Sequence, residues 1–184
     1  MSLEMKIIHY SDQYDPLLKS HVSQSNFLFC TGDLSIFDFR EVEKQLANVS
    51  CFGVCGNHCA HGYLEELGIT NVHLKVSQCG KLTIGGYQGC LRYKTGGDFQ
   101  FTENEATNDL AAFPHVDILL LHAPPFGLLD DIDDPVHSGS KAVRHYVDIR
   151  KPKLIFCGHD PPSAELTYGE TMIYRTYQSR LIEI

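Results

Sequence analysis

The sequence has 184 residues, of which 43% are hydrophobic and 21% charged, enough for one domain with a sizeable core. The formal net charge of −8 argues against a broad nucleic-acid-binding surface, which needs clustered Lys and Arg, but it permits a small phosphorylated substrate. Apolar runs stay below about 18 residues, so no membrane-spanning helix is expected.

The N-terminus and the cysteines bear on localisation. The first residues lack the pattern of a secretion signal, and Met1-Ser2-Leu3 has the form of a cloning remnant. The chain has seven cysteines, an odd number, which favours a reducing cytoplasm without a disulfide framework. Cys51, Cys55 and Cys59 are evenly spaced, but a zinc cluster is the less favoured interpretation because no second CxxC pair completes a tetrahedral site.

The first half of the chain alternates short apolar runs with helical patterns. A helix is expected over 38–47, with Asp38 as a possible N-cap, and another over 61–67, stopped by Gly68. The expected strands cover residues 6–10, 26–30 and 50–55.

The second half continues the alternation. Two β-rich runs around Gly80-Lys81 predict a hairpin within 74–87, and two more meet at the turn 168–170. The remaining expected elements are helices at 102–113 and 140–149 and strands at 116–121 and 153–157. Strands that alternate with helices predict βαβ units and a partly parallel sheet, and the hairpins add antiparallel pairs.

Polar side chains follow five of the apolar strands. Carboxylate, amide oxygen and imidazole are ligands that suit Mn, Fe or Zn, and sites in open α/β sheets form beyond the carboxyl ends of strands. Each motif alone is a weak signal, but five on successive strand ends predict one site. The glycines before three of these residues would let the backbone turn sharply there. The residues are Asp12, Asp33, Asn57-His58, His122 and His159.

In their order these motifs resemble those of the calcineurin-like metallophosphoesterases, which are D-x-H, G-D, G-N-H-D/E, a lone H and G-H-x-H. The loop His122-Ala123-Pro124-Pro125-Phe126-Gly127 and the later Gly139-Ser140-Lys141 are similar to one branch of that family. The resemblance implies a four-layer α/β/β/α sandwich of mixed sheets flanked by helices, formed by residues 1–184 as a single domain. It also implies hydrolysis of a phosphomonoester or phosphodiester through a metal-activated water.

The resemblance also assigns roles to residues. Asp33 would bridge two metals, and Asp12 would belong to the first of them. Asn57, His122 and His159 would complete the shell of the second metal. The cofactor would be one or two divalent ions of Mn, Fe or Zn.

His58 would stand beside the phosphoryl group, as general acid or charge stabiliser. Three positions depart from the family pattern. Tyr14 replaces the His of D-x-H, and Pro161 replaces the second His of G-H-x-H, so both losses fall on the first metal. Either that site is lost, or Tyr14 or Asp160 supplies an oxygen ligand. Cys59 stands where the family has an acid, which would weaken support for His58.

Two functions remain open at this stage. The kept Asn57-His58 pair and the intact second-metal set favour an enzyme acting on a small phosphorylated substrate. The two lost ligands favour a catalytically impaired binding or scaffold module with a protein partner, as in the retromer subunit that keeps this fold. Neither interpretation involves a membrane.

Four further segments give weaker signals. Residues 130–134 are acidic and are expected to form a solvated turn near the site, rather than a calcium loop. The glycine-rich 85–89 is expected to be a turn where the backbone approaches the site. Residues 92–94, and the helix start at 139–140, could contact a substrate phosphate.

Overall fold

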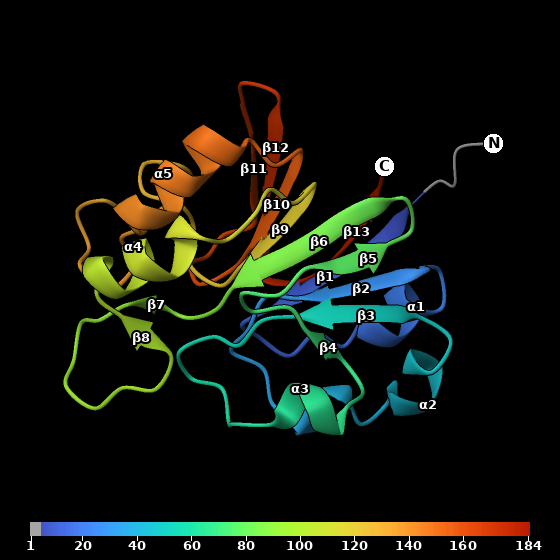
Figure 1. The fold of residues 1–184 in the computed structure, drawn as a ribbon. Coiled ribbons are helices and arrows are strands. Elements are labelled where there is room, and N and C mark those ends of the chain that lie inside the picture. The colour runs from blue at the N-terminus through green and yellow to red at the C-terminus, as the bar shows by residue number, and fades with distance from the viewer. Residues whose placement is uncertain (1–4) are drawn as a thin grey trace.

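The computed structural model describes residues 5–184, so the expected remnant Met1-Ser2-Leu3 lies outside the described residues. Figure 1 shows two β-sheets that face each other, with helices on the outer side of each. The first sheet has the order β13-β1-β2-β3-β4, with the bounds Gln178–Glu183, Lys6–Ser11, Phe27–Cys30, Ser50–Gly53 and Thr70–Asn71.

The second sheet contains the strands from the later part of the chain. Its order is β11-β12-β10-β9-β6-β5, with the bounds Ala164–Tyr168, Thr171–Arg175, Leu154–Cys157, Ile118–Leu121, Leu82–Tyr87 and Ser77–Cys79. A separate small pair consists of β7 (Cys90–Leu91) and β8 (Gln100–Phe101). The helices are α1 (Leu18–Val22), η1 (Ile36–Phe39), α2 (Glu43–Leu46), α3 (Tyr63–Glu66), α4 (Glu103–Ala111) and α5 (Lys141–Arg150).

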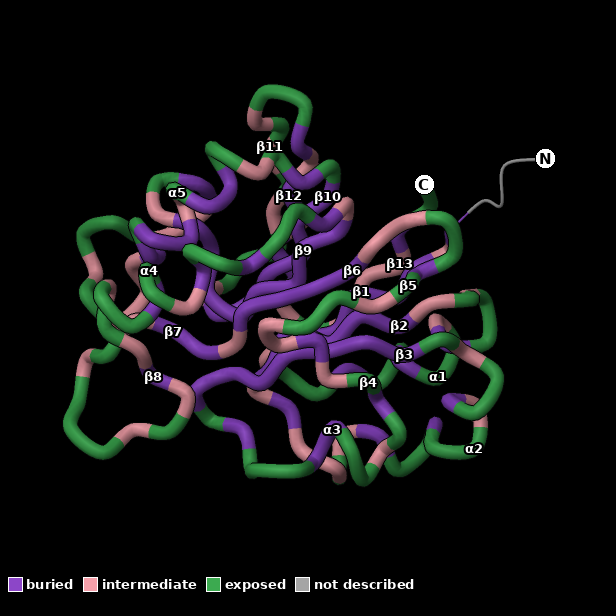
Figure 2. Tube along the Cα trace, in the orientation of Figure 1, coloured by how far each residue is buried: buried purple, intermediate pink, exposed green. Residues whose placement is uncertain are grey.

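The central strands are apolar along their whole length because both of their faces are buried. In β9, Leu119 and Leu121 pack toward α4 and α5 in one core cluster, whereas Ile118 and Leu120 pack against the other sheet in a second cluster. A third cluster fills the space between the first sheet and α1, α2 and α3. Figure 2 shows these strands buried and the outer loops exposed.

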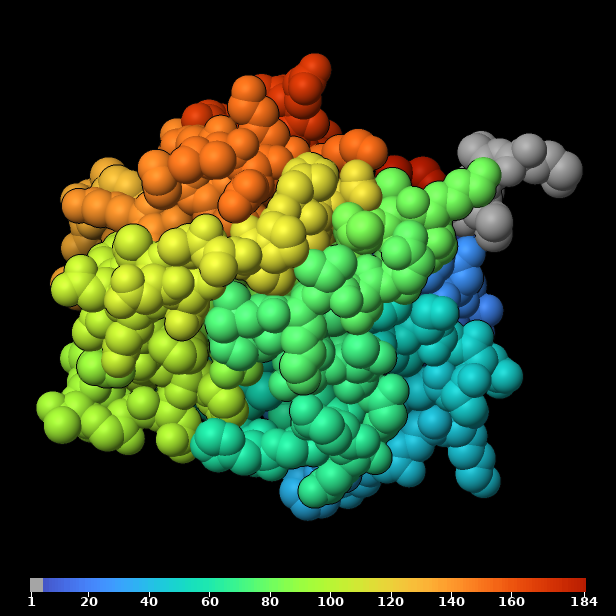
Figure 3. Space-filling view, viewed as in Figure 1, coloured from blue at the N-terminus to red at the C-terminus, as the bar shows by residue number. Residues whose placement is uncertain are grey.

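Three core layers between four structural layers confirm the predicted α/β/β/α class. In Figure 3, the green β5–β6 hairpin lies between the cyan first half of the chain and the yellow-to-red second half. Within the described residues, no helix combines the length and apolar character that crossing a bilayer requires.

Strand direction brings the polar strand ends together. β1, β2 and β3 are parallel, and so are β6, β9, β10 and β12. The carboxyl ends of parallel strands share one edge of a sheet, and ligand sites form there.

The predicted helix over 38–47 is wrong as a single element. The chain forms η1 and then a separate α2, because Ser35 begins the first turn and its amide and hydroxyl both donate to the Asp38 carboxylate. Asp38 is therefore the third helical residue of a capping box and not the N-cap.

Two other differences concern strands. Gly85 and Gly86 lie inside β6 rather than in a turn. A Cβ at Gly86 would press on the Leu120 carbonyl of the neighbouring strand, so glycine fits this position. The sequence analysis did not identify β13, which pairs antiparallel with β1 from Lys6–Glu183 to Ser11–Gln178. The hairpin at Gly80 is confirmed, with β5 and β6 antiparallel on either side.

Candidate metal centre

Three of the strand-end residues have a backbone conformation that L residues rarely adopt. Asp12, Asp33 and His159 have φ angles of 67°, 54° and 75°, all in the left-handed region. Such strained positions persist only where surrounding contacts hold them, and they cluster at functional sites. The turn after each strand therefore directs its side chain back over the sheet edge.

Glycines beside these residues allow the close approach of neighbouring chains. A Cβ on Gly56 would overlap the carboxylate of Asp33, and a Cβ on Gly158 would overlap the side chains of Ser11 and Asp12. Only Gly32, among the three glycines expected to turn sharply, has a positive φ, at 98°. At Gly56 and Gly158 the missing side chain makes room for the site instead.

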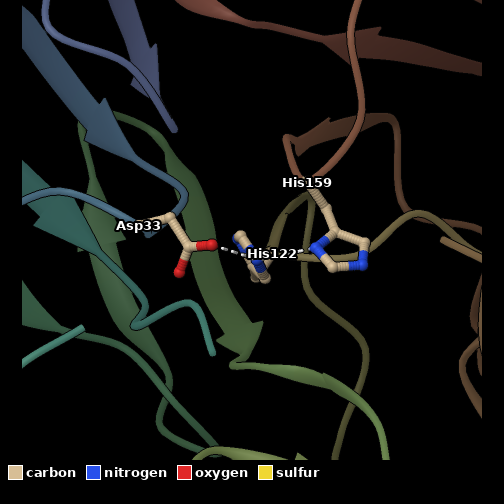
Figure 4. A group of neighbouring side chains, drawn as sticks. All are labelled: Asp33, His122 and His159. Carbon is tan, nitrogen blue, oxygen red and sulfur yellow. Dashed lines mark hydrogen bonds and ion pairs between the residues drawn. The ribbon is translucent and has the colours of Figure 1, made fainter. Parts of the chain in front are cut away.

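Four side chains from four strand ends converge on one point (Figure 4, which draws three of them). Nε2 of His122 lies 3.0 Å from Oδ1 of Asn57, 3.0 Å from Nδ1 of His159 and 3.4 Å from Oδ2 of Asp33. The atoms of Asp33, His122 and His159 that could bind a metal all lie within 4.8 Å of one another. His122 is fully buried, and Asn57 and His159 are nearly so.

In His122 and His159, the ring nitrogen that points away from the site has its own hydrogen-bond partner. Nδ1 of His122 lies 2.7 Å from the Thr31 carbonyl, and Nε2 of His159 lies 2.8 Å from the Val136 carbonyl. A carbonyl only accepts, so both of these nitrogens carry hydrogen, and each ring turns its other nitrogen toward the site.

Asn57 is oriented in the same way. Its amide nitrogen donates to the Tyr93 hydroxyl at 3.2 Å, which turns its oxygen toward His122.

The donor set fits one divalent ion. Ligand atoms about 2.1 Å from a metal stand about 3.0 Å apart in an octahedral shell and about 3.4 Å apart in a tetrahedral one. The distances of 3.0 to 3.4 Å from His122 match that spacing. Two imidazole nitrogens, a carboxylate and an amide oxygen are borderline to hard ligands, which suit Mn, Fe or Zn.

In the metal-free site, His122 is the residue with the main electrostatic role. Burial opposes a charge on this ring, but the Asp33 and Asp12 carboxylates outweigh it and raise the pKa of His122 to about 9. Burial likewise opposes the Asp33 carboxylate, but His122 and the His58 amide lower its pKa to about 2. Burial, together with the charge on His122, lowers the pKa of His159 to about 3. One proton on His122 thus faces three acceptors.

Comparison with known proteins identifies the family. Residues 8–163 match the family model described as calcineurin-like phosphoesterase. The chain belongs to the calcineurin-like phosphoesterase family. It is also 26% identical, over 84% of its length and 79% of the relative's, to an uncharacterized protein of Methanocaldococcus jannaschii.

Solved structures with the same fold include proteins of named activity. TT1561 of Thermus thermophilus has a TM-score of 0.63 at 16% identity, covering 93% of this chain and 88% of that one. The phosphopantetheinyl hydrolase of Mycobacterium tuberculosis has a TM-score of 0.62 at 11% identity, covering 95% and 89%. A novel archaeal phosphodiesterase reaches 0.55 at 11% identity, covering 98% and 100%. At these identities the likeness extends to the fold.

His58, the acid expected from the sequence, is an exposed residue next to Asn57. Its backbone amide donates to Oδ1 of Asp33 at 2.7 Å, while the residue itself is exposed. This contact fixes the second oxygen of Asp33 and leaves the His58 ring facing solvent.

The residues expected at the first metal position are dispersed. Asp12 lies beside the centre, where its Oδ2 accepts from the His159 amide at 2.9 Å. Tyr14 is 45% exposed and lines a surface depression with Phe37 and Arg40. Asp160 forms an ion pair with the buried Arg175 at 2.8 Å. Neither possible substitute ligand joins the group formed around His122.

Sequence reasoning did not identify Tyr93 and Val136 as residues that orient the centre. Tyr93 was only considered as a phosphate contact, yet it holds Asn57. Val136 follows the acidic loop, where Asp134 accepts from the Val136 amide and from the His137 ring. No motif marks either residue, because the contacts come from loops distant in sequence.

Two suggested phosphate contacts are occupied by other groups. Glu103 accepts from the Ser140 hydroxyl and from the amides of Lys141 and Ala142, so its carboxylate already fills the start of α5. Arg92 pairs with Glu105 at 3.0 Å.

The cysteines are all free and buried. Among the described residues, Cys51, Cys55 and Cys59 form no metal-binding group.

Proposed function

We propose that this protein is a metal-dependent phosphoesterase in which Asp33, Asn57, His122 and His159 hold one divalent ion. The observation that carries the proposal is the convergence of four potential ligand atoms on side chains that other contacts orient. Acceptors of Asp33, Asn57 and His159 all face Nε2 of His122, and acceptors so close together need a proton or a cation among them, which supports a metal site. The substrate would be a phosphomonoester or a phosphodiester.

A bound ion would supply Lewis acidity toward the phosphoryl oxygens and lower the pKa of a water molecule. The chain's own residues would do the rest. Thr31 and Val136 hold the two imidazoles in place through their carbonyls. His58 stands at the open side, where its ring could donate a proton to the leaving-group oxygen as the phosphorus–oxygen bond of the ester breaks.

We infer that one ion binds rather than two. Tyr14 is turned to a surface depression, and Asp160 is engaged by Arg175, so neither side chain lies where a first metal would need it. Asp12 keeps a carboxylate beside the centre, but its Oδ2 holds the His159 backbone. In this proposal, Asp12 supports the backbone of a ligand.

Two variants of the manganese-loaded protein test the proposal against chromogenic phosphomonoesters and phosphodiesters. His58→Ala should lower the rate by roughly 10²–10⁴-fold, as removal of a positioned acid does, and keep its metal. His159→Ala should lose both metal and rate, because it removes one of four ligands. Metal content of the two variants, measured by elemental analysis, separates proton donation from metal binding. Equal metal loss in both would contradict the assigned roles.

A binding or scaffold role on the same fold is the alternative, and the replaced Tyr14 and Pro161 favour it. The two functions give different results for the wild type. Metal-loaded protein that hydrolyses no ester of either class would support the scaffold role.

A further inference from the structure

Cys59 connects two of the loops that carry the metal centre. Its sulfur accepts from the backbone amide of Asp33 at 3.1 Å and from that of Gly56 at 3.1 Å. Asp33 follows β2 and Gly56 follows β3, so one sulfur bridges the ends of two neighbouring strands. Cys59 is only 7% exposed, which protects these contacts from water.

The first of these amides belongs to a strained residue. Asp33 has a φ of 54°, a strained conformation that persists only where its surroundings hold it. An amide with no acceptor in this buried place would add a further penalty. The sulfur of Cys59 supplies that acceptor, so it stabilises the turn that directs the Asp33 carboxylate inward.

The second amide immediately precedes Asn57. The same loop returns a contact, since the amide of His58 donates to Oδ1 of Asp33. The two loops are thus linked in both directions, by the sulfur on one side and by the carboxylate on the other. This double link sets the spacing between the Asp33 and Asn57 oxygens that face His122.

We propose that Cys59 is a positioning residue of the metal centre, whose sulfur fixes the Asp33 and Asn57 loops in the ligating arrangement. This inference rests on the proposed metal-binding function. It also revises the expectation from sequence, in which the loss of an acid at this position would weaken His58. The sulfur contacts the backbone of the two ligand loops and takes the place of an acceptor there.

The competing explanation is that Cys59 only fills the core between the first sheet and its helices. Cys51 provides a matched control, because it is 8% exposed and belongs to the same core cluster. Its sulfur contacts the Leu46 and Val49 carbonyls, away from the ligand loops. Removing either sulfur creates a similar small cavity, so both alanine variants should lose thermal stability. Cys59→Ala should lose more, because the Asp33 and Gly56 amides also lose their acceptor.

Calorimetric titration with Mn²⁺, without substrate, distinguishes the two explanations. Cys59→Ala should bind Mn²⁺ about 10–100-fold more weakly than the wild type, whereas Cys51→Ala should bind it with unchanged affinity. Cys59→Ser keeps an acceptor on a shorter bond and should restore part of the loss. This partial rescue is not expected of a residue that only fills space.

The outcomes are separable. Equal Mn²⁺ affinity in Cys59→Ala and Cys51→Ala overturns the positioning role while leaving the proposed function intact. If Cys59→Ala does not fold, Cys59→Val decides, because it fills the space without an acceptor, and wild-type Mn²⁺ affinity in that variant rules against the inference. A wild type that binds no Mn²⁺ overturns the proposed function itself.

Discussion

Metal binding to this centre should release a proton from His122. In the metal-free protein that proton lies among Asp33, Asn57 and His159, at the place where the ion would bind. With a pKa of about 9, His122 is mostly protonated at pH 7.5. The pKa values of about 3 for His159 and about 2 for Asp33 mean that His159 is neutral and Asp33 is ionised at this pH.

The expected release is therefore about one proton per ion at pH 7.5. Below pH 9, each unit of acidification should lower the apparent affinity about tenfold, so binding at pH 6 should be about 100-fold weaker than at pH 8. Titration calorimetry in buffers of different ionisation enthalpy gives the number of protons directly. Release of no proton, or an affinity that is constant from pH 6 to pH 8, would refute this account of the site.

NMR titration of the metal-free protein tests which group raises the pKa of His122. Asp33→Asn removes the carboxylate that most favours the charged His122 ring. Burial should then dominate, and the pKa of His122 should fall below its ordinary 6.5. Asp117→Asn is the matched control, because Asp117 pairs with Lys153 and belongs to no part of the centre. An unchanged His122 titration in Asp33→Asn would show that another group holds the proton.

Three further predictions concern stoichiometry, packing and pH. Reloading with Mn²⁺ after mild chelation should give nearer one ion than two per chain by elemental analysis; two would mean that another group completes a second site. Gly56→Ala should lower the free energy of unfolding by about 1–3 kcal/mol and abolish metal binding, measured by thermal unfolding and calorimetry, since its Cβ overlaps Asp33. The stabilisation that protonated His122 gives the metal-free fold should be full below pH 6.5 and lost as the pH rises through 9, which pH-dependent melting would detect.

The positions of the strand ends were accessible from sequence for a physical reason. Strands buried on both faces are apolar throughout, so a polar residue after such a run marks the point where the strand leaves the core. That rule located Asp33, Asn57, His122 and His159 before their distances were known. Strand direction then brings them to one edge, which explains why a linear pattern sufficed.

The groups that orient the ligands were not accessible in this way. Tyr93 and Val136 act through one hydroxyl and one carbonyl, from loops whose paths depend on the tertiary structure. The prediction of one helix over 38–47 failed for a local reason. A capping box at Ser35 begins a helical turn before the position that the apolar spacing suggested. β13 was missed because its partner is β1, at the far end of the chain.

This last pairing affects how the protein is made. β1 has β2 on one side and β13 on the other, and its register joins Lys6 to Glu183. During synthesis, one edge of β1 stays unpaired until β13 has left the ribosome. An open edge of this kind can pair with another chain, so the nascent protein is exposed to aggregation at this edge before β13 emerges. Asp12 directly follows β1, so this part of the centre takes its final place only after the distant β13 has paired.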